Sequence, residues 1–578
     1  MSIREHLLRG NESGTLLETV NALWMSLEDR SAVTSELVAL HNEGLVDAVA
    51  AFEPLRDTSP AGTDFFLTRH VFEQALPDLD SPVPAVMHCV LRLYDAAGRD
   101  LAAGTVVESF IHYCERDASR PREALAEIEA SPDVFARLLP GTLVAGSRVD
   151  TASFLAEAIR LCEADHIELR RHAVFSLGKL EWPEGGEAAD SALATLERAA
   201  KAETDGQILA GVVTSAFALV KQHGALEPHV VAVIATALSK GDENTIHSGS
   251  EVLGFRTGEL TATLLDTLFV HLPRVRSTDK GTLDNIDFGL SHLLESSDPE
   301  RGIELLETLL LRRPDELTME VFDSAGRAIL TNRALINKVA TRWFLRGDRA
   351  LCEAVSTIIA SGVIGDLPLE IDAAELKLAD SSHIIFTARK AIGYLFMEPI
   401  SAAAFLISLM RSTADQEVLT ALGVLLFDPL LLNYPGKARD YVARQLGQES
   451  GQVKATVGEA FARLDDYLED LKSVGRLPAL HPSTAHRDAY ERHFSRQMEE
   501  SWKAAEANSG LLSLVSKSVV LFGRTSITYV RGLDEQPRRM ESPMQTHETE
   551  MELPRILRLD PLGLDFKLRV FRVEQITA

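Results

Sequence analysis

The sequence predicts a mainly α protein, an α-solenoid of helical pairs followed by a small C-terminal β module. Three observations lead to this prediction. Apolar residues recur every three to four positions through most of the 578 residues, which is the spacing of amphipathic helices. One helical pattern recurs between residues 165 and 464, and such recurrence indicates stacked helices. Beyond residue 510, β-forming residues replace the helical pattern.

The clearest copy of the recurring pattern is residues 165–180, with the sequence DHIELRRHAVFSLGKL. We expect Asp165 to accept hydrogen bonds from the free N–H groups of the first helical turn, and Gly178 to let a neighbouring backbone come close. The apolar face that we expect to be buried consists of Leu169, Ala173, Leu177 and Leu180. One helical pair cannot bury such a face alone, so the copies must stack on one another.

Further copies occupy residues 205–220, 380–395 and 449–464, and fainter ones run through Gly249–Gly254 and start at Asp415. Asp205 lies 40 residues after Asp165, and Asp415 lies 35 residues after Asp380. The D-x-x-x-L-R-x-x-A…L-G-x-L form of residues 165–180 resembles the second helix of a HEAT repeat. This resemblance implies an α-solenoid that presents an extended surface to a protein partner, and it implies no particular reaction.

Four segments are expected along the chain. Residues 1–150 predict a helical region that we interpret as a solenoid cap, since solenoid ends must hide an apolar face; a separate partner-recognition domain is the alternative. Residues 151–472 predict the HEAT-like repeat array. Residues 473–510 contain a proline-bearing linker and then a long polar helix, whose apolar seam is Phe494, Met498 and Trp502.

The fourth segment, residues 511–578, predicts the β module. Residues 514–522 and 526–530 predict a hairpin, and residues 553–559 and 564–573 predict a second strand pair with its turn at 560–563. The polar stretch 534–552 between them contains two prolines and predicts a loop. Such a module adds a contact for a partner, binds the chain's own solenoid, or pairs two copies.

The composition narrows the class of protein. The chain carries 58 Lys+Arg against 85 Asp+Glu, a formal net charge of -27, which repels nucleic-acid phosphates and anionic membranes. The four cysteines lie far apart, so neither a disulfide framework nor a zinc site is expected. The N-terminus lacks the apolar core of a signal peptide, and the most apolar runs, 400–410 and 421–432, are too short to span a bilayer. We expect a cytoplasmic protein that does not bind membranes.

No sequence pattern points to an enzyme, a cofactor or a metal site. The chain has no G-x-S-x-G, G-x-x-x-x-G-K-[ST], G-x-G-x-x-G or H-E-x-x-H motif. The His547-Glu548 pair falls in the expected C-terminal loop rather than on a repeat helix, so it does not indicate bound iron. We interpret His88-Cys89 and His112-x-Cys114 as packed helical residues, because nothing positions the histidine as the base of a Cys–His dyad.

Basic residues gather between positions 327 and 349, where Asp348 is the only acid. Lys338, Arg342 and Arg346 are spaced by four and form one helical stripe, and Arg349 follows; we name these four residues the basic ridge. Aligned cations repel one another, so they need neighbouring carboxylates or an anionic partner. The first interpretation is neutralisation by acids on adjacent helices, such as Glu316, Glu320 and Asp323. The second is an anion-binding site.

Three functional hypotheses follow. The leading one is a non-enzymatic scaffold or adaptor that binds a protein partner along its solenoid. The second is a regulatory or inhibitory subunit of an enzyme or toxin, as in a microbial conflict or defence system, whose acidic surface masks a basic active site. The third is a binder of anions or nucleic acid that uses the basic ridge, although the net charge disfavours nucleic acid.

Overall fold

The structure of the chain is a computed structural model. It describes residues 2–26, 30–56, 64–98, 101–183, 187–361, 367–377, 379–447, 451–475, 483–508, 515–520, 525–531, 537–543 and 552–576. The chain divides into two compact units, Met1–Asn332 and Arg333–Ala578. Helices dominate both units, so the predicted mainly α fold is confirmed.

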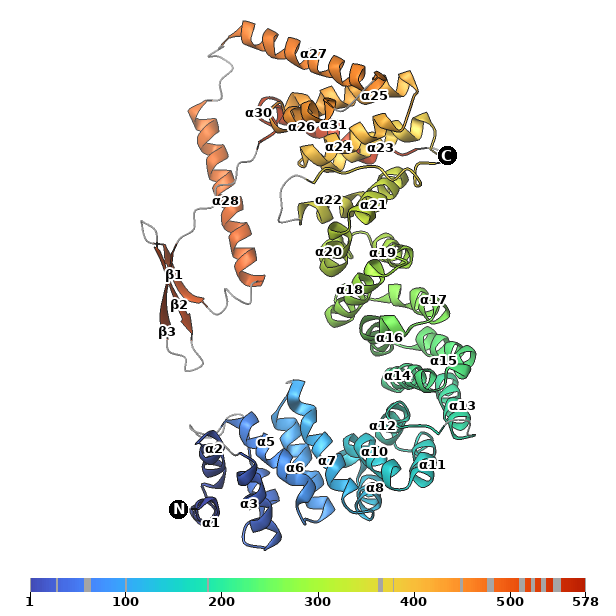
Figure 1. Ribbon diagram of the computed structural model, residues 1–578, viewed down its shortest axis with the longest axis vertical. Coiled ribbons are helices and arrows are strands. Elements are labelled where there is room, and N and C mark those ends of the chain that lie inside the picture. Colours follow the sequence, from blue (N-terminus) through green and yellow to red (C-terminus); the bar gives the residue numbers. More distant parts are fainter. Residues whose placement is uncertain are drawn as a thin grey trace. The chain divides into compact units, whose positions relative to one another are not determined.

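The first unit is a stack of helices (Figure 1). Its described α-helices are α1 (Ile3–Ser13), α2 (Leu16–Ser26), α3 (Ser31–Asn42), α4 (Ala48–Phe52), α5 (Phe65–Ala75), α6 (Val83–Ala96), α7 (Thr105–Glu115), α8 (Arg120–Ala130), α9 (Pro132–Phe135), α10 (Leu139–Val149), α11 (Thr151–Leu161), α12 (Ile167–Leu177), α13 (Glu187–Ala202), α14 (Gly206–Gln222), α15 (Glu227–Lys240), α16 (Glu243–Arg256), α17 (Ala262–His271), α18 (Lys280–Glu295), α19 (Glu300–Arg312) and α20 (Asp323–Thr331). The 3₁₀ turns are η1 (Leu76–Asp78), η2 (Leu101–Gly104), η3 (Ala136–Leu138), η4 (Gly224–Leu226), η5 (Thr257–Glu259), η6 (Leu272–Arg274) and η7 (Met319–Val321).

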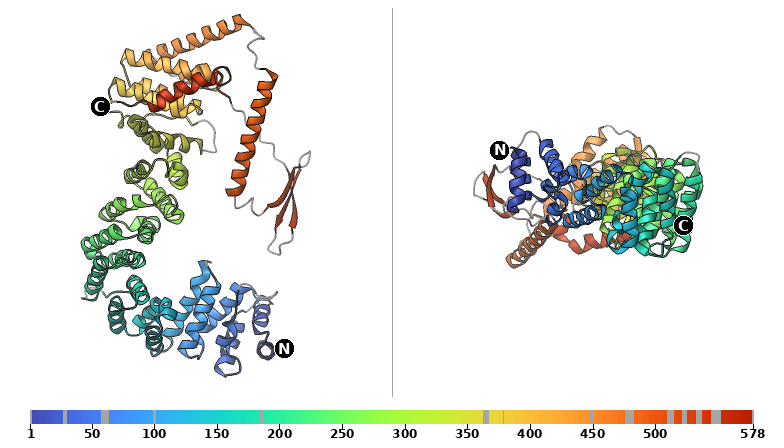
Figure 2. Two further views of the ribbon diagram at one scale, coloured as in Figure 1. Left: turned by 180° about the vertical axis from the view of Figure 1, so that it is seen from behind. Right: turned by 90° about the horizontal axis from the view of Figure 1, so that it is seen from below.

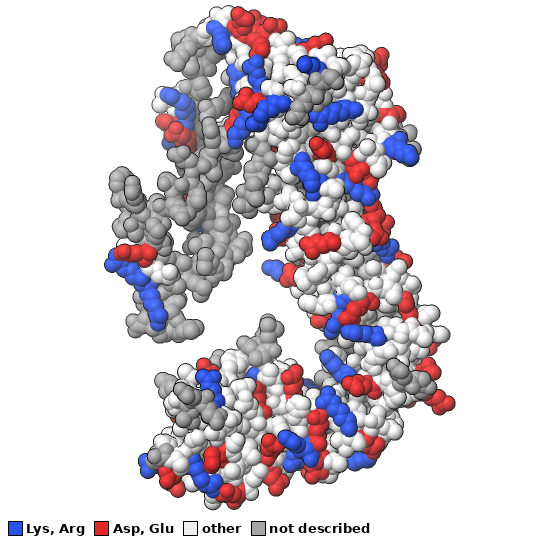
Figure 3. Space-filling model, in the orientation of Figure 1, with Lys and Arg blue, Asp and Glu red and all other residues white. Residues whose placement is uncertain are grey.

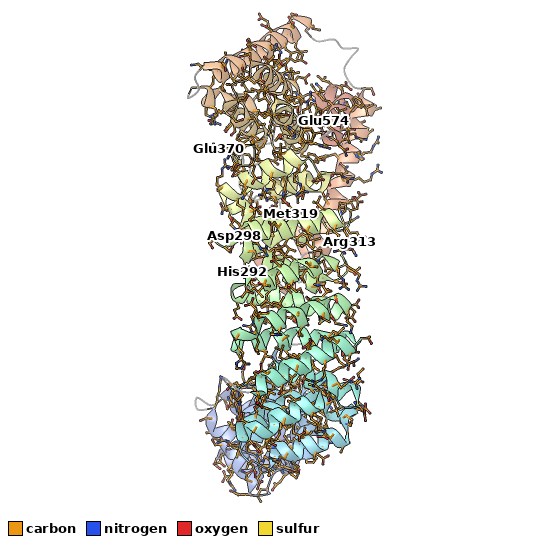
Figure 4. All side chains as sticks on the ribbon, turned by 90° about the vertical axis from the view of Figure 1, so that its right-hand side faces the viewer. His292, Asp298, Arg313, Met319, Glu370 and Glu574 are labelled. Carbon is orange, nitrogen blue, oxygen red and sulfur yellow. The ribbon has the colours of Figure 1, made fainter. Side chains whose placement is uncertain are left out.

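From α10 onward the helices of the first unit form two rows. In one row α10, α12, α14, α16, α18 and α20 pack successively against one another, and α11, α13, α15 and α17 form the other row. Figure 2 shows the same rows from behind. Figure 4 shows their side chains, with His292 near the end of α18 and Arg313 just after α19. Stacked helices in two rows are the α-solenoid that the repeated pattern predicts.

The repeated pattern marks the buried face of this solenoid, as expected. Leu177 is 1% exposed, and its counterpart in the next copy, Phe217, is 6% exposed; Leu209, the counterpart of Leu169, is fully buried. A Cβ atom at Gly178 would lie 2.8 Å from the Cα of Ser215 in α14, so a larger residue would push the helices apart. The Ser215 hydroxyl uses this proximity to donate to the carbonyl of Val174 (2.7 Å).

The acid that opens a copy caps the helix at Asp205, Asp380 and Asp415. Each of these carboxylates accepts hydrogen bonds from first-turn N–H groups, of α14 and of the second-unit helices that begin at Ser381 and Gln416. The expectation for Asp165 is wrong. Helix α12 begins at Ile167, so the cap position falls on His166, whose ring accepts from the N–H of Glu168 (3.3 Å). The acid of the last copy, at position 449, lies outside the described residues.

The second unit continues with helices and adds a small sheet. Its described elements are α21 (Arg333–Arg346), α22 (Arg349–Ala360), α23 (Ser381–Leu395), α24 (Pro399–Arg411), α25 (Gln416–Leu425), the π-helical η8 (Leu426–Leu431), α26 (Lys437–Leu446), α27 (Gly451–Val474), α28 (Thr484–Asn508), β1 (Val515–Val520), β2 (Thr525–Arg531), β3 (Pro537–Pro543), α30 (Ile556–Leu559) and α31 (Pro561–Val573). Helices α21, α23, α25 and α27 pack in one row, and α24 packs on α26 beside them.

The strands form an antiparallel sheet in the order β1-β2-β3. The β1–β2 hairpin is the one that the sequence predicts, with Ser518 opposite Thr528. Strand β3 falls in the stretch 534–552, which we expected to be a loop because of its prolines. Pro537 and Pro543 stand at the two ends of β3 on the edge of the sheet, where a missing N–H removes little ladder hydrogen bonding.

The second predicted strand pair is wrong, because residues 556–559 and 561–573 are helical. Asp560 caps α31 by accepting from the N–H of Gly563 (2.9 Å), and Pro561 takes the first helical position. The Asp-Pro pair therefore starts a helix instead of making a turn. Leu564 and Leu568, one helical turn apart, are buried. Among the described residues, the β module is confined to β1–β3.

Helix α31 packs against α23 of the same unit. The Arg572 guanidinium donates through Nε to the carbonyl of Gly393, and Lys390 Nζ donates to the carbonyl of Arg572, both at 2.6 Å. A Cβ atom at Gly393 would lie 3.2 Å from the Cβ of Phe571 and from Cγ of Arg572. A helix, rather than a strand pair, therefore covers part of the second unit's own solenoid.

The core assignment gives a first testable prediction. Replacing Leu177 by alanine should lower the free energy of unfolding of the first unit by about 2–5 kcal/mol, because it leaves a cavity in a packed core. The matched control is Ile167→Ala on the same helix. The Ile167 side chain is 38% exposed, so its truncation should lower the free energy of unfolding by about 0.5 kcal/mol or less. Urea unfolding of both variants measures the difference, and equal stabilities would show that Leu177 does not lie in the core.

The docking of α31 gives a second prediction. Gly393→Leu should detach α31, because the added side chain runs into Phe571 and Arg572 while leucine itself favours the helix of α23. Amide hydrogen exchange of residues 561–573 should then accelerate. Gly458→Leu in α27 is the control, since nothing lies within 4 Å of the added Cβ. Unchanged protection of α31 in Gly393→Leu would contradict this docking.

Candidate protein-binding groove

A groove with a volume of about 740 Å³ crosses five helices of the first unit that pack one after another, α7, α10, α12, α14 and α16, and residues of α6 also line it. Its lining includes the small residues Pro140, Ala210 and Gly211. A Cβ atom at Gly211 would lie 3.3 Å from Val174 Cγ1, so α12 and α14 meet closely at this position and no side chain rises from it. The close packing of the row therefore creates the hollow.

The aromatic residues Tyr94 and Phe175 line the groove. Phe175 of α12 is 36% exposed, although it belongs to the helix that best matches the repeat. Lys179 Nζ lies 5.2 Å from the centre of its ring, which fits a cation–π contact. An exposed ring beside small lining residues offers a place for an apolar side chain of a partner.

Charged residues on the rim are held by ion pairs. Arg171 donates to both carboxylate oxygens of Asp205, through Nε at 3.1 Å and Nη2 at 2.6 Å, and Nη1 donates to Glu168 (2.5 Å). The hydrogen bond from Arg171 is the main cause that holds the pKa of Asp205 below its ordinary value. Because Asp205 also caps α14, one carboxylate fixes both the start of α14 and an arginine on α12.

Uncharged polar groups complete the lining. His172 is partly buried in the groove, and burial lowers its pKa, so the ring is held toward its neutral form. Gln207 of α14 and Asn244 of α16 are exposed at corresponding places near the starts of their helices. Amide side chains both donate and accept hydrogen bonds, as does the backbone of an extended peptide.

A second hollow of about 790 Å³ lies at the ends of α16 and α18. Phe255 is 63% exposed and Phe288 is 42% exposed, and their ring centres are 5.9 Å apart. His292 packs edge-on against Phe288. The two helices come close here because Gly254 faces the carbonyl of Asn285. The helical pattern alone did not reveal either hollow, since each depends on which residues of different helices become neighbours.

The basic ridge is placed on α21 and at the start of α22, and each of its members lies beside a carboxylate. Arg342 donates to both oxygens of Glu375 (3.1 and 2.9 Å), and Lys338 lies 3.9 Å from the same carboxylate. Arg346 pairs with Asp348 (3.1 Å) and Arg349 with Glu353 (2.8 Å). Lys and Arg side chains likewise lie among Asp and Glu on the face of each unit shown in Figure 3.

Two of the three acids named from the sequence as neutralising the ridge pair with other residues. Glu316 pairs with Arg313 (3.2 Å), and Asp323 pairs with Arg327 (2.8 Å). Glu375 comes instead from the segment 367–377, which lies along α21; there the N–H of Asp372 donates to the hydroxyl of Thr341 (2.9 Å). No helical period marks this segment, so periodicity could not place its carboxylate.

Other candidate chemistry is not supported by the described residues. All four cysteines are free and buried, and burial raises the pKa of the Cys114 thiol to about 12, which disfavours a nucleophilic thiolate. His88 packs on the ring of Phe135, and His112 lies 3.0 Å from Glu115. No cluster of metal-ligating side chains occurs in the described ranges, and the pair at 547–548 lies outside them.

No helix within the described residues is both long enough and apolar enough to cross a bilayer.

The ion pair between Asp205 and Arg171 predicts that the stability of the first unit depends on pH. A pKa lowered on folding stabilises the folded state above the unfolded-state pKa of about 3.9, and that stabilisation is lost as pH falls through the lower folded-state pKa. Asp205→Asn keeps a capping side chain but removes the charge, so it should lower stability by about 1 kcal/mol at neutral pH, and by less as the solution is acidified below about pH 4.

Asp242→Asn is the matched control for this prediction. Asp242 caps α16 in the same way, and among the described residues no Lys or Arg side chain forms an ion pair with it. Its replacement should therefore change stability little at either pH, because asparagine caps about as well as aspartate. Urea unfolding of the three proteins at neutral and acidic pH measures the effect. A pH-independent loss in Asp205→Asn would contradict the role of the ion pair.

Comparisons with known proteins add a distant structural similarity. No protein-family model matches the chain, and the search of curated proteins gives no match. Among solved structures, a chain in the structure of the Pds5–Scc1 complex aligns with 88% of this chain and 85% of its own length, at 10% sequence identity and a TM-score of 0.27. The assignment to the α-solenoid class rests on the two rows of helices described above.

Proposed function

We propose that the chain is a non-enzymatic scaffold or adaptor whose helical repeats, of the HEAT type, bind an extended segment of a protein partner. The observation that carries this proposal is the groove across α7, α10, α12, α14 and α16. Neighbouring helix axes lie about 8–10 Å apart, so five helices offer a track of about 32–40 Å. An extended peptide covers this length with about 10–12 residues.

The charges of the groove favour a polypeptide over a nucleic acid. Its rim carries Arg137, Arg171 and Lys179 against Glu108, Glu168 and Glu251, so it has no excess of cations to neutralise phosphates. The body of the chain is also acidic overall. A lining that combines apolar residues with amide side chains suits a partner that presents alternating apolar side chains and backbone polar groups.

The cysteines support a cytoplasmic location. All four are unpaired and buried, which is the usual state of thiols in a reducing compartment. A role in holding proteins together requires no reactive thiol, and the raised thiol pKa values fit that role.

The proposal is tested with selected peptides. Peptides of about 12 residues, chosen from a random display library on the intact chain, should bind the groove. Phe175→Ala should then weaken their binding at least about tenfold, or about 1.4 kcal/mol, since exposed rings beside a hollow act as anchors. Fluorescence polarisation measures the affinities.

Val270→Ala on α17 is the control, because Val270 is 68% exposed and does not line the groove. It should leave the affinities unchanged. Equal affinity of the selected peptides for the unmodified chain and for Phe175→Ala would place their binding elsewhere and contradict the groove as the partner site.

A further inference from the structure

A cavity of about 880 Å³ in the second unit is lined by α23, by the turn before α22 and by α31 with the residues after it. Five cations line it, and three carboxylates accompany them. The cations are Arg346, Arg349, Lys390, Arg569 and Arg572, and the carboxylates are Asp348, Glu353 and Glu574. The cavity thus carries excess positive charge within a chain of net charge -27. It includes the half of the basic ridge formed by Arg346 and Arg349.

Lys390 is the buried centre of this charge. It is 1% exposed, and its ammonium donates to the carbonyl of Arg572 at 2.6 Å and lies 5.1 Å from the centre of the Phe386 ring. Among the described residues, no carboxylate forms a recorded ion pair with it. Burial lowers the pKa of Lys390, because it removes water from around the ammonium.

The surrounding backbone fixes Lys390 in this position. Gly347 has φ +73°, in the left-handed region that favours glycine, and a Cβ atom there would lie 2.4 Å from the Phe386 ring and 3.2 Å from Cε of Lys390. The turn before α22 therefore lies directly on the lysine stem and cannot be widened by a side chain at position 347.

Like Lys390, Arg572 has mainly neutral groups as partners within the cavity. Its Nε donates to the carbonyl of Gly393, and its guanidinium carbon lies 5.7 Å from the centre of the Tyr394 ring. The other cations have carboxylate partners: Arg346 with Asp348, Arg349 with Glu353, and Arg569 with Asp565. The third carboxylate of the cavity, Glu574, pairs with Arg389 (2.6 Å), so Lys390 and Arg572 supply the unbalanced charge.

We propose that this cavity binds an oxyanion, a phosphate or carboxylate group, between Lys390 and Arg572. An ammonium has three N–H donors, and the hydrogen bond to Arg572 uses one of them. Charge-assisted hydrogen bonds to an oxyanion offset the cost of burying these cations. A phosphate group alone is much smaller than the cavity, so the oxyanion is carried by a larger ligand, as is usual for pockets of about 300–1,000 Å³.

The proposed site joins two parts of the chain. Lys390 belongs to α23, whereas Arg569 and Arg572 belong to α31. A ligand that binds only when both are in place favours the docked position of α31. Anion binding is therefore expected to slow amide hydrogen exchange in residues 561–573.

The test is calorimetric titration of the full chain with inorganic phosphate at constant ionic strength, followed by hydrogen exchange. Saturable binding is expected, with greater protection of α31. Lys390→Met, which keeps an apolar stem, and Arg572→Gln should each weaken binding at least about tenfold. The same titration is repeated with acetylated tripeptides that carry a phosphoserine or a glutamate. Tighter binding of either tripeptide supports an oxyanion carried by a protein partner. Binding of inorganic phosphate alone would contradict the larger ligand and assign the site to the free ion.

Lys240→Met is the matched control. Like Lys390, Lys240 donates to backbone carbonyls, two in its case (3.0 and 2.8 Å), but it lies in α15, outside the cavity. It should bind phosphate as the unmodified chain does. If Lys390→Met fails to fold, Arg572→Gln decides alone. Undiminished binding in a folded variant of either residue, or no saturable binding of phosphate, phosphoserine or glutamate, would overturn the proposal.

Discussion

Close approach between neighbouring helices is the constraint on which the rest of the structure depends. An amphipathic helix in this chain buries its apolar face against neighbouring helices of its own row and of the other row, and small residues set how near those helices come. Gly178 admits Ser215, and Gly254 admits the carbonyl of Asn285. Small residues also contribute to the groove, because Gly211 has no side chain above the contact between α12 and α14. Packing and groove thus share one cause.

The two candidate sites differ in how they are built. The groove of the first unit is made by helices that pack one after another in one row, and its charges are balanced, with pairs such as Arg171 and Asp205. The cavity of the second unit needs a segment from the far end of the sequence, and two of its cations, Lys390 and Arg572, rest on carbonyls and aromatic rings. Balanced charge suits a polypeptide backbone, whereas unbalanced buried charge suits an oxyanion.

Much of the fold could be predicted from the sequence, because helical periodicity and caps are local signals. The caps at Asp205, Asp380 and Asp415, the buried Leu177 and the β1–β2 hairpin all follow from neighbouring residues. Errors arose where one local pattern fits two structures. Asp560-Pro561 begins a helix as readily as it makes a turn, and the burial of Leu564 and Leu568 on the solenoid favours the helix.

The sites were harder to predict than the fold, because they depend on contacts between distant residues. The basic ridge was visible as a stripe on one helix, but its partner Glu375 belongs to a segment without helical period. Neither Lys390 nor Arg572 stands out in the sequence. They become neighbours only when α31 lies on α23, and the groove exists only when five helices align.

The position of α31 also sets an order of assembly during translation. Lys390 and Arg572, which are in hydrogen-bonding contact, are 182 residues apart. At roughly 5–20 residues per second, a ribosome needs roughly 10–40 s to make the chain between them. Throughout that interval α23 lacks the helix that covers Gly393, and its apolar surface is open to chaperones or to other nascent chains. Completion of the second unit is therefore a late, non-local step, whereas neighbouring helices of the first unit can pack as they emerge.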